Sequence, residues 1–434
     1  MRRTIFALPA TLLLLTACSD APQIVNEPPG DSTPAAPGEQ VASALERDTN
    51  PNVDNATMAQ LTQSNRAFLV DLFQELRGNE GNLFVSPHSI SIALAMTYAG
   101  AMGNTKAEMG SAMHFDLGEP ALHQAFNALD LELASRAQQT GEQDGDGFRL
   151  SIVNQLFGQT GFPFEQPFLD TLAVNYGAGM RLLDFENDPD GCRQLINDWV
   201  EDATEDRIED LLPDGSIDTL TRIVLANAIY FKASWSAPFK ASETTDDTFH
   251  LLDGETATVP TMHGSVGGTH ASGDGWTLVE IPYIGQQVTM GLFVPDAERF
   301  AEIEAAFDAG LLEEALGGLS SADITLALPK FSFRSEYDLV PTMQSLGMID
   351  AFGDANFSAM TSVPGLVITG IFHQAFVDVN EQGTEAAAAT AVVGGLTSAP
   401  EPVTVTIDRP FLFWIRDVPT GAMLFAGRVS DPRG

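Results

Sequence analysis

Histidines and cysteines are the side chains of this 434-residue sequence best suited to covalent or metal chemistry. There is no Gly-x-Ser-x-Gly, His-Glu-x-x-His or Walker motif and no cysteine pair with metal-ligand spacing. His263 and His270 sit in a glycine-rich stretch that predicts a solvated turn. The other histidines are spread along the chain, at His88, His114, His123, His250 and His373. We therefore predict that the protein is not an enzyme and holds no metal or other cofactor.

The segment from Glu381 to Val393 has a different character, because it is built mainly from alanine, threonine and valine. Its alanines are compatible with a short helix or a low-complexity linker. Two features argue against both: the segment lies between the strand-like stretches Ala375–Val379 and Val403–Ile407, and it is far longer than a usual hairpin loop. A long loop of small residues can be exposed in one state and enter a crowded sheet in another.

The elements around this loop follow from apolar periodicity. Helical spacing predicts helices over Met58–Leu76, Ile90–Ala101 and Asn197–Leu212. Apolar runs predict strands over Arg222–Phe231, Leu278–Pro282, Val288–Val294, Ile324–Leu328, Ala375–Val379, Val403–Ile407 and Phe411–Ile415. Helices that come first and strands that crowd the second half are typical of an α+β domain with large sheets.

The charge of the chain limits its partners. It has 59 acidic and 21 basic residues, a formal net charge of −38. Such a surface repels nucleic acids, heparin-type polyanions and anionic lipid head groups. We expect none of these to be a partner.

The N-terminal residues predict an export signal followed by a tether. A basic start, a short apolar run and Leu15-Thr16-Ala17-Cys18 resemble a bacterial lipoprotein signal peptide over 1–17, with Cys18 as the lipidated residue. An ordinary signal peptide with an incidental cysteine is the alternative. Residues 18–55 are rich in Pro, Ala, Glu, Asp and Ser and predict a disordered tether, followed by a folded domain over 56–434. We expect an exported protein on the cell envelope or surface, bound to the membrane only through this lipid, or otherwise secreted. Cys192 would have no disulfide partner.

Together the segments after the tether resemble the serpin family over about 370 residues. Each motif alone is weak, but their order and spacing are specific. They are Asn82–Ile90 (NLFVSPHSI), Asn197–Val200 (NDWV), Leu225–Lys232 (LANAIYFK) with Trp235, Leu328–Phe331 (LPKF), Leu346–Met348 (LGM), Asp408–Phe413 (DRPFLF) and Gly427–Val429 (GRV).

The resemblance implies a serpin fold, which is α+β with about three β-sheets, eight to nine helices and an exposed reactive-centre loop. It also implies inhibition of serine proteases by a suicide-substrate mechanism, in which the loop is cleaved, the protease is trapped as an acyl-enzyme and the loop inserts into the main sheet. In a strand, alternate residues share one face. Here that face would be small and uncharged: Thr384, Ala386, Ala388, Thr390 and Val392. This favours inhibition over the alternative, a non-inhibitory serpin-fold binding or surface interaction protein.

Individual residues match the functional positions of the family. The hinge of the loop would be Glu381, Gly383, Thr384, Glu385, Ala386, Ala387, Ala388, Ala389 and Thr390. A polar cluster where the sheet opens would consist of Ser86, Ser89, Asn227 and His373. Lys330 and Glu381 match a charged pair near the insertion gap, and Trp235 matches a tryptophan above it. Gly394-Gly395 departs from good strand material.

Two ways of counting place the cleaved bond differently. The family pattern, counted from the hinge glycine, places it at Thr397-Ser398. Counted back from Pro410, the same pattern places it at Ala399, and Leu396 is a further alternative. No lysine or arginine lies between Thr384 and Asp408. The implied partner of this monomer is therefore an elastase-like, subtilisin-like or chymotrypsin-like protease and not a trypsin-like one.

Overall fold

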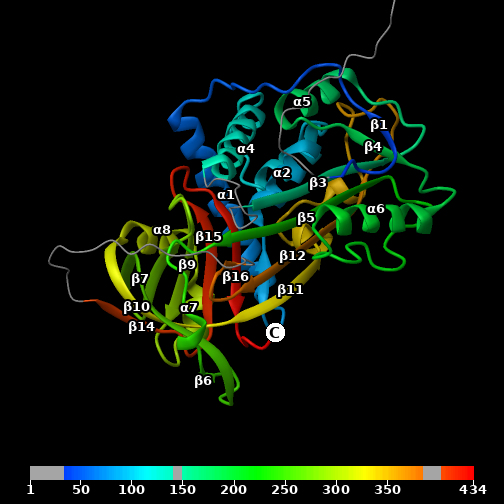
Figure 1. Ribbon diagram of the computed structural model, residues 1–434. Coiled ribbons are helices and arrows are strands. Elements are labelled where there is room, and N and C mark those ends of the chain that lie inside the picture. Colours follow the sequence, from blue (N-terminus) through cyan, green and yellow to red (C-terminus); the bar gives the residue numbers. More distant parts are fainter. Residues whose placement is uncertain (1–33, 140–148, 385–401) are drawn as a thin grey trace, which may run out of the picture. The chain divides into compact units, whose positions relative to one another are not determined.

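The computed structural model describes residues 34–139, 149–384 and 402–434 (Figure 1). All of these residues belong to a single unit. Its elements are nine α-helices, two short 3₁₀ helices and sixteen strands among the described residues. The predicted α+β class and the predicted helix number are confirmed.

The main sheet has seven strands. Their order is β1 (Glu39–Val41), β4 (Met180–Leu183), β3 (Arg149–Gln159), β5 (Ile223–Ser234), β13 (Gly383–Thr384), β12 (Ile368–Val379) and β11 (Phe331–Asp338). The short strand β13 lies between β5 and β12 at one end and is antiparallel to both. Beyond it, β5 and β12 pair directly and in parallel, from Ile223 with Ile368 to Tyr230 with Phe376. We call this direct β5–β12 pairing the seam.

The second sheet is a continuous path of eight strands with a ninth at its side. The path is β14 (Val403–Thr406), β10 (Ser320–Pro329), β7 (Thr256–Gly273), β8 (Trp276–Pro282), β9 (Val288–Pro295), β15 (Phe411–Asp417), β16 (Met423–Val429) and β2 (Leu83–Val85). Strand β6 (Thr245–His250) pairs with one end of β7, and β8 pairs with the other. The long strand β7 thus joins two parts that could be counted as separate sheets, so the hydrogen bonds define two sheets among the described residues where about three were predicted. The predicted turn around His263 and His270 is wrong, because both lie on β7.

The α-helices lie beside these sheets and, in the case of the buried helix α2 (Pro87–Tyr98), between strands of both (Figure 1). They are α1 (Asn55–Leu76), α2 (Pro87–Tyr98), α3 (Gly103–Ala112), α4 (Ala121–Gln139), α5 (Gln166–Tyr176), α6 (Pro189–Ala203), α7 (Phe300–Ala306), α8 (Ala309–Gly317) and α9 (Val340–Ser345), with the 3₁₀ helices Ala241–Glu243 and Asp350–Phe352. In the described ranges, none of them combines the length and the apolar character that a membrane span requires.

Helix α6 is displaced from its predicted position at Asn197–Leu212. It begins earlier because Asp188 accepts a hydrogen bond from the Gly191 N–H, which caps the helix ahead of Pro189. It ends earlier because Glu205 and Asp206 adopt positive φ angles of 54° and 60°, outside the helical region. The segment that follows α6 is therefore irregular.

The core consists of two clusters of buried apolar side chains. The larger extends through the second sheet and its helices. The smaller lies between α6 and one face of the main sheet, where Ile196 and Val200 pack with Val153 of β3, Ala228 of β5 and Phe372 of β12. Helix α6 thus covers both sides of the seam.

Residues 34–54 differ from the predicted disordered tether, because they pack onto the domain. Strand β1 pairs antiparallel with β4 and covers the edge of the main sheet. The Trp199 indole N–H donates to the Pro34 carbonyl at 2.7 Å, and Ala36 is buried beneath α6. Arg47 forms an ion pair with Asp130 of α4 at 2.6 Å. The apolar residues in this stretch thus suffice to add it to the edge of a sheet that already exists.

Arg428 connects strand β16 to the segment between α1 and β2. On β16, which pairs with β2, its guanidinium donates to the carbonyls of Arg77, Asn79 and Gly81. It also forms an ion pair with Glu304 at 2.8 Å, and both side chains are nearly buried.

Candidate functional site

The hinge of the predicted loop begins inside the main sheet. Thr384 is 1% exposed and pairs with Val379 of β12 and with Ala233 of β5. Its hydroxyl is hydrogen-bonded to the Tyr283 hydroxyl at 2.7 Å. Gly383 has no room for a side chain, because a Cβ atom there would lie 2.1 Å from the Ala233 carbonyl oxygen. The first two strand residues of the hinge are therefore already inserted.

Trp235 fixes the chain just before this point. Its ring stacks on Tyr283 with centroids 4.6 Å apart, and its indole N–H donates to the Asn380 carbonyl at 2.9 Å. The backbone N–H of Trp235 donates to the Gln382 carbonyl at 2.7 Å. The tryptophan predicted to lie above the gap thus fixes the backbone of Asn380 and Gln382, which precedes the inserted residue Thr384.

The predicted charged pair is formed. Lys330 Nζ lies 2.9 Å from Glu381 Oε2, and Thr244 donates its hydroxyl to the same carboxylate at 2.8 Å. Burial by itself raises the pKa of Glu381, but the hydrogen bonds from Lys330 and Thr244 outweigh it and hold the pKa below its usual value. Glu381 therefore stays ionised beside the inserted hinge.

The four residues of the predicted polar cluster also meet, and all are at most 1% exposed. The Ser86 N–H donates to His373 Nε2 at 3.1 Å, and His373 Nδ1 is bonded to the side-chain oxygen of Asn227. This assigns a neutral histidine with its proton on Nδ1. Asn227 donates to the Ser89 hydroxyl at 2.8 Å. Because His373 and Asn227 are register partners on β12 and β5, the cluster spans the seam.

Asn154 completes this cluster and was not predicted. It lies opposite Asn227 on β3, donates to the Ser89 carbonyl at 3.2 Å and accepts from the Ser89 hydroxyl at the same distance. Only the register of β3 against β5 could have identified it, and no part of β3 was predicted from apolar runs.

Burial of His373 makes stability dependent on pH. Burial lowers the pKa of His373 to about 3 and that of His88, another buried histidine, to about 4. Both folded values lie below the unfolded value of about 6.5, so the unfolded chain binds protons first and stability falls as the pH falls below about 6.5. Each histidine contributes a slope that grows from about 0.7 kcal/mol per pH unit at pH 6.5 to about 1.3 kcal/mol per pH unit at pH 5. In urea melts between pH 5 and 6.5, His373→Gln is expected to remove about half of the combined slope. An unchanged slope would contradict this assignment.

Several predicted residues lie outside the described residues. These are Cys18, the later hinge residues Glu385, Ala386, Ala387, Ala388, Ala389 and Thr390, Gly394-Gly395, and the candidates for the cleaved bond, Leu396, Thr397, Ser398 and Ala399. Cys192 is described, and its thiol is 4% exposed with a pKa raised by burial to about 11. This thiol is therefore unreactive.

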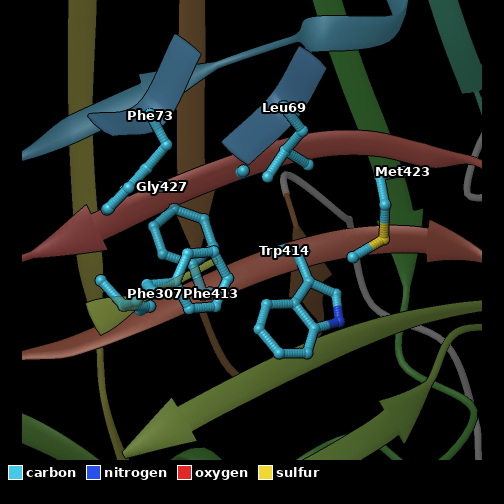
Figure 2. Close-up of a pocket in the computed structure, with 9 residues that line it drawn as sticks. Leu69, Phe73, Phe307, Phe413, Trp414, Met423 and Gly427 are labelled. Atoms are coloured by element: carbon cyan, nitrogen blue, oxygen red, sulfur yellow. The ribbon is translucent and has the colours of Figure 1, made fainter. Parts of the chain in front are cut away.

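Figure 2 shows a separate cavity between α1 and the strands β15 and β16. It is lined by apolar side chains such as Leu69, Phe73, Trp414 and Met423 and has a volume of about 10 Å³. That is about the space of one water molecule. No group of three or more His, Cys, Asp and Glu side chains suited to a metal ion occurs in the described ranges.

Comparison with known proteins gives consistent matches. A family model described as Serpin (serine protease inhibitor) matches residues 63–432. An uncharacterised serpin-like protein of Thermococcus kodakarensis is 35% identical over the whole of both chains. The leukocyte elastase inhibitor of Equus caballus is 35% identical and covers 86% of this chain and 100% of its own length. The crystal structure of uncleaved ovalbumin has a TM-score of 0.75 at 26% identity and covers 86% of this chain and 100% of that chain.

Proposed function

This chain belongs to the serpin family, and we propose that it inhibits serine proteases as a single-use bait. The protease serine attacks the carbonyl of the scissile bond, forms an ester with the loop and releases the new amino terminus that follows the bond. The loop on the N-terminal side of the cut then enters the main sheet between β5 and β12. The protease is carried along while the ester is intact, so the chain acts as a retained substrate and not as a catalyst.

The position of β13 is the observation that carries this proposal. Gly383 pairs with β5 and Thr384 with both β5 and β12, so further insertion continues a strand whose register is set. The residues that follow are Glu385 and then alanines and threonine up to Thr390. Continued insertion replaces one parallel set of β5–β12 pairings by two antiparallel ladders, which adds hydrogen bonds.

The target class follows from the loop sequence. Without lysine or arginine between Thr384 and Asp408, the loop offers no cation to a trypsin-like specificity pocket. We propose elastase-like, subtilisin-like or chymotrypsin-like targets and cleavage at Thr397-Ser398, with Leu396 and Ala399 as neighbouring alternatives. The leukocyte elastase inhibitor among the relatives is consistent with this class.

A serpin-fold binding protein is the alternative function. The cavity in Figure 2 gives it little support, since about 10 Å³ does not accommodate an organic ligand.

We also propose that the protein is exported and held at the cell envelope or surface through a lipid on Cys18. The support is the sequence Leu15-Thr16-Ala17-Cys18 after a basic and apolar start. Labelled fatty acid should be incorporated into the full chain and not into the Cys18→Ser variant. Equal incorporation by the two proteins would contradict the anchor.

A panel of proteases tests the proposed inhibition. Incubation with elastase, subtilisin and chymotrypsin should give complexes that survive boiling in detergent, whereas trypsin should give none. Mass spectrometry should show that the released C-terminal peptide begins at Ser398. If every protease in the panel cuts the loop and is released as active enzyme, the result supports the binding protein instead of the inhibitor. A stable complex with trypsin would overturn the proposed target class.

A further inference from the structure

Pro34, the first described residue, lies at one end of the main sheet. Its carbonyl accepts from the Trp199 indole N–H, and the Trp199 ring packs edge-on against Phe157 of β3 with ring centres 5.8 Å apart. Phe157 is the register partner of Val224, at the beginning of β5. Strand β1 lies at the same level, because β4 aligns it with Leu156–Gly158 of β3. The chain therefore enters the domain where β5 begins.

The hinge of the loop lies at the opposite end of the same strand. Gly383 pairs with Ser234 and Thr384 with Ala233, at the end of β5. Ala233 follows Val224 by nine positions, which corresponds to about 30 Å along an extended strand. The entry of the chain and the hinge of the loop are therefore at opposite ends of the main sheet.

Residues 34–54, which we call the strap, are fixed to the domain at several points. Gly38 has a φ of 91°, and a Cβ atom there would lie 2.5 Å from the Leu182 carbonyl oxygen of β4. The Ser43 hydroxyl donates to the Asp170 carboxylate of α5 at 2.6 Å. These contacts add to the pairing of β1 with β4 and to the ion pair with α4. The strap thus fixes the point at which the preceding chain leaves the domain.

The chain between the proposed lipid and the strap is short. Sixteen residues run from Cys18 to Thr33. A flexible chain of this length has a root-mean-square end-to-end distance of about 22 Å. A folded domain of about 400 residues is wider than this, because its radius of gyration alone is about 21 Å. A lipid on Cys18 therefore brings the end of the main sheet that carries Pro34 closest to the bilayer.

We propose that the strap orients the domain on the bilayer and displays the loop at the end of the domain that is farther from the lipid. This inference rests on the proposed lipid on Cys18. In this orientation, the loop is open to soluble proteases that arrive from the aqueous side. Release of the strap lengthens the chain between lipid and domain to 37 residues, with a root-mean-square length of about 33 Å. Its exit point moves to α1, and the orientation is lost.

Two exposed positions mark the two ends of the main sheet. Leu220 is 70% exposed and lies just ahead of β5. Ser242 is exposed and belongs to the 3₁₀ helix beside the hinge. It is placed there because the Phe239 N–H donates to the Glu381 carbonyl at 2.8 Å and the Thr244 hydroxyl donates to the Glu381 carboxylate. A fluorescent donor at each position reports the height of that end above the bilayer.

Energy transfer to labelled lipids measures these two heights in the lipidated chain on phosphatidylcholine vesicles. The donor is attached to a single new cysteine, in either Leu220→Cys or Ser242→Cys. Cys18 carries the lipid, and Cys192 is buried and unreactive, so only the new cysteine takes the label. The Ser242→Cys donor is expected to lie about 20–30 Å farther from the bilayer than the Leu220→Cys donor, because the length of β5 separates them.

The double variant Ala36→Glu/Gly38→Glu releases the strap. Ala36 is buried beneath α6 and Gly38 has no room for a side chain, so neither carboxylate can be accommodated. The family model matches residues 63–432, so the strap lies outside the part of the chain that defines the fold. Ala35→Glu/Gln40→Glu is the matched control, since it adds the same charge at exposed positions. The released variant should lose most of the height difference, and the control should keep it.

Equal heights for the two donors with an intact strap, or an unchanged difference after its release, would overturn the orientation. A chain that carries no lipid does not sediment with the vesicles, and the proposed anchor then fails. In that case, a hexahistidine tag in place of Cys18 and a nickel-chelating lipid supply the same attachment point. The two heights are then measured in the same way, so the orientation is tested separately from the anchor.

Discussion

A single cut between Thr384 and Pro402 is expected to raise the melting temperature by about 12 °C. The freed end can continue the strand that β13 begins, and about ten new ladder hydrogen bonds at about 1 kcal/mol each give about 10 kcal/mol. For a domain of about 380 residues, the unfolding entropy corresponds to about 0.8 kcal/mol per degree. The native fold is then less stable than its own cleaved form and persists because insertion is slow.

Differential scanning calorimetry of nicked and intact protein measures this shift. A protein nicked at an engineered site within residues 140–148 is the matched control, because that cut lies between α4 and β3 in the sequence, and β3 is already paired with β5 along its length. It should not melt higher than the intact protein. If the loop-cleaved protein melts with the intact one, the loop does not insert and the proposed mechanism is wrong.

Replacement of Thr384 by arginine is expected to convert the inhibitor into a substrate. Thr384 is buried against Tyr283. A guanidinium at that place would be removed from water and would have no opposite charge beside it. A cost of several kcal/mol at the first step of insertion lets the protease hydrolyse the ester before it is trapped. Since 1.4 kcal/mol is a factor of ten in this competition, about ten or more molecules should be consumed for each protease inhibited.

Titration of a fixed amount of protease gives this stoichiometry directly. Thr384→Val is the control, since it keeps the size of the side chain and removes only the hydrogen bond with Tyr283. It should remain an inhibitor with a modest increase in consumption. The uncleaved arginine variant should still fold, because its hinge can leave the sheet. Wild-type stoichiometry for Thr384→Arg would show that this position does not enter the sheet during inhibition.

The sequence was sufficient for the parts of the site that family motifs mark. Lys330 and Glu381 are adjacent in the structure although 51 residues separate them in the sequence, and Ser86, Ser89, Asn227 and His373 form one network. Ser86, Ser89, Asn227 and Lys330 stand in motifs of the family, whereas Glu381 and His373 were identified by matching single positions of its pattern. For these residues, the match to the family pattern was enough to predict which side chains lie together.

The features that escaped prediction depend on contacts between distant segments. Asn154 is recognisable only through its register against Asn227, and the bond from Thr384 to Tyr283 joins residues 101 positions apart. Residues 34–54 look disordered by composition because their apolar side chains are few. They become ordered because β4 offers an unpaired edge. The end of α6 was missed because acidic residues at positive φ carry no clear sequence signal.

The contacts of Arg428 have a consequence for how this chain is made. Strand β2 pairs with β16, and Arg428 binds the carbonyl of Gly81, which lies 347 residues earlier. During synthesis, the residues around Gly81 leave the ribosome long before their partners exist, so the second sheet cannot close until the last strand is available. Contacts of such sequence separation slow folding. A chain that stops before β16 would expose the apolar faces of β15 and β2, whereas the complete chain buries them.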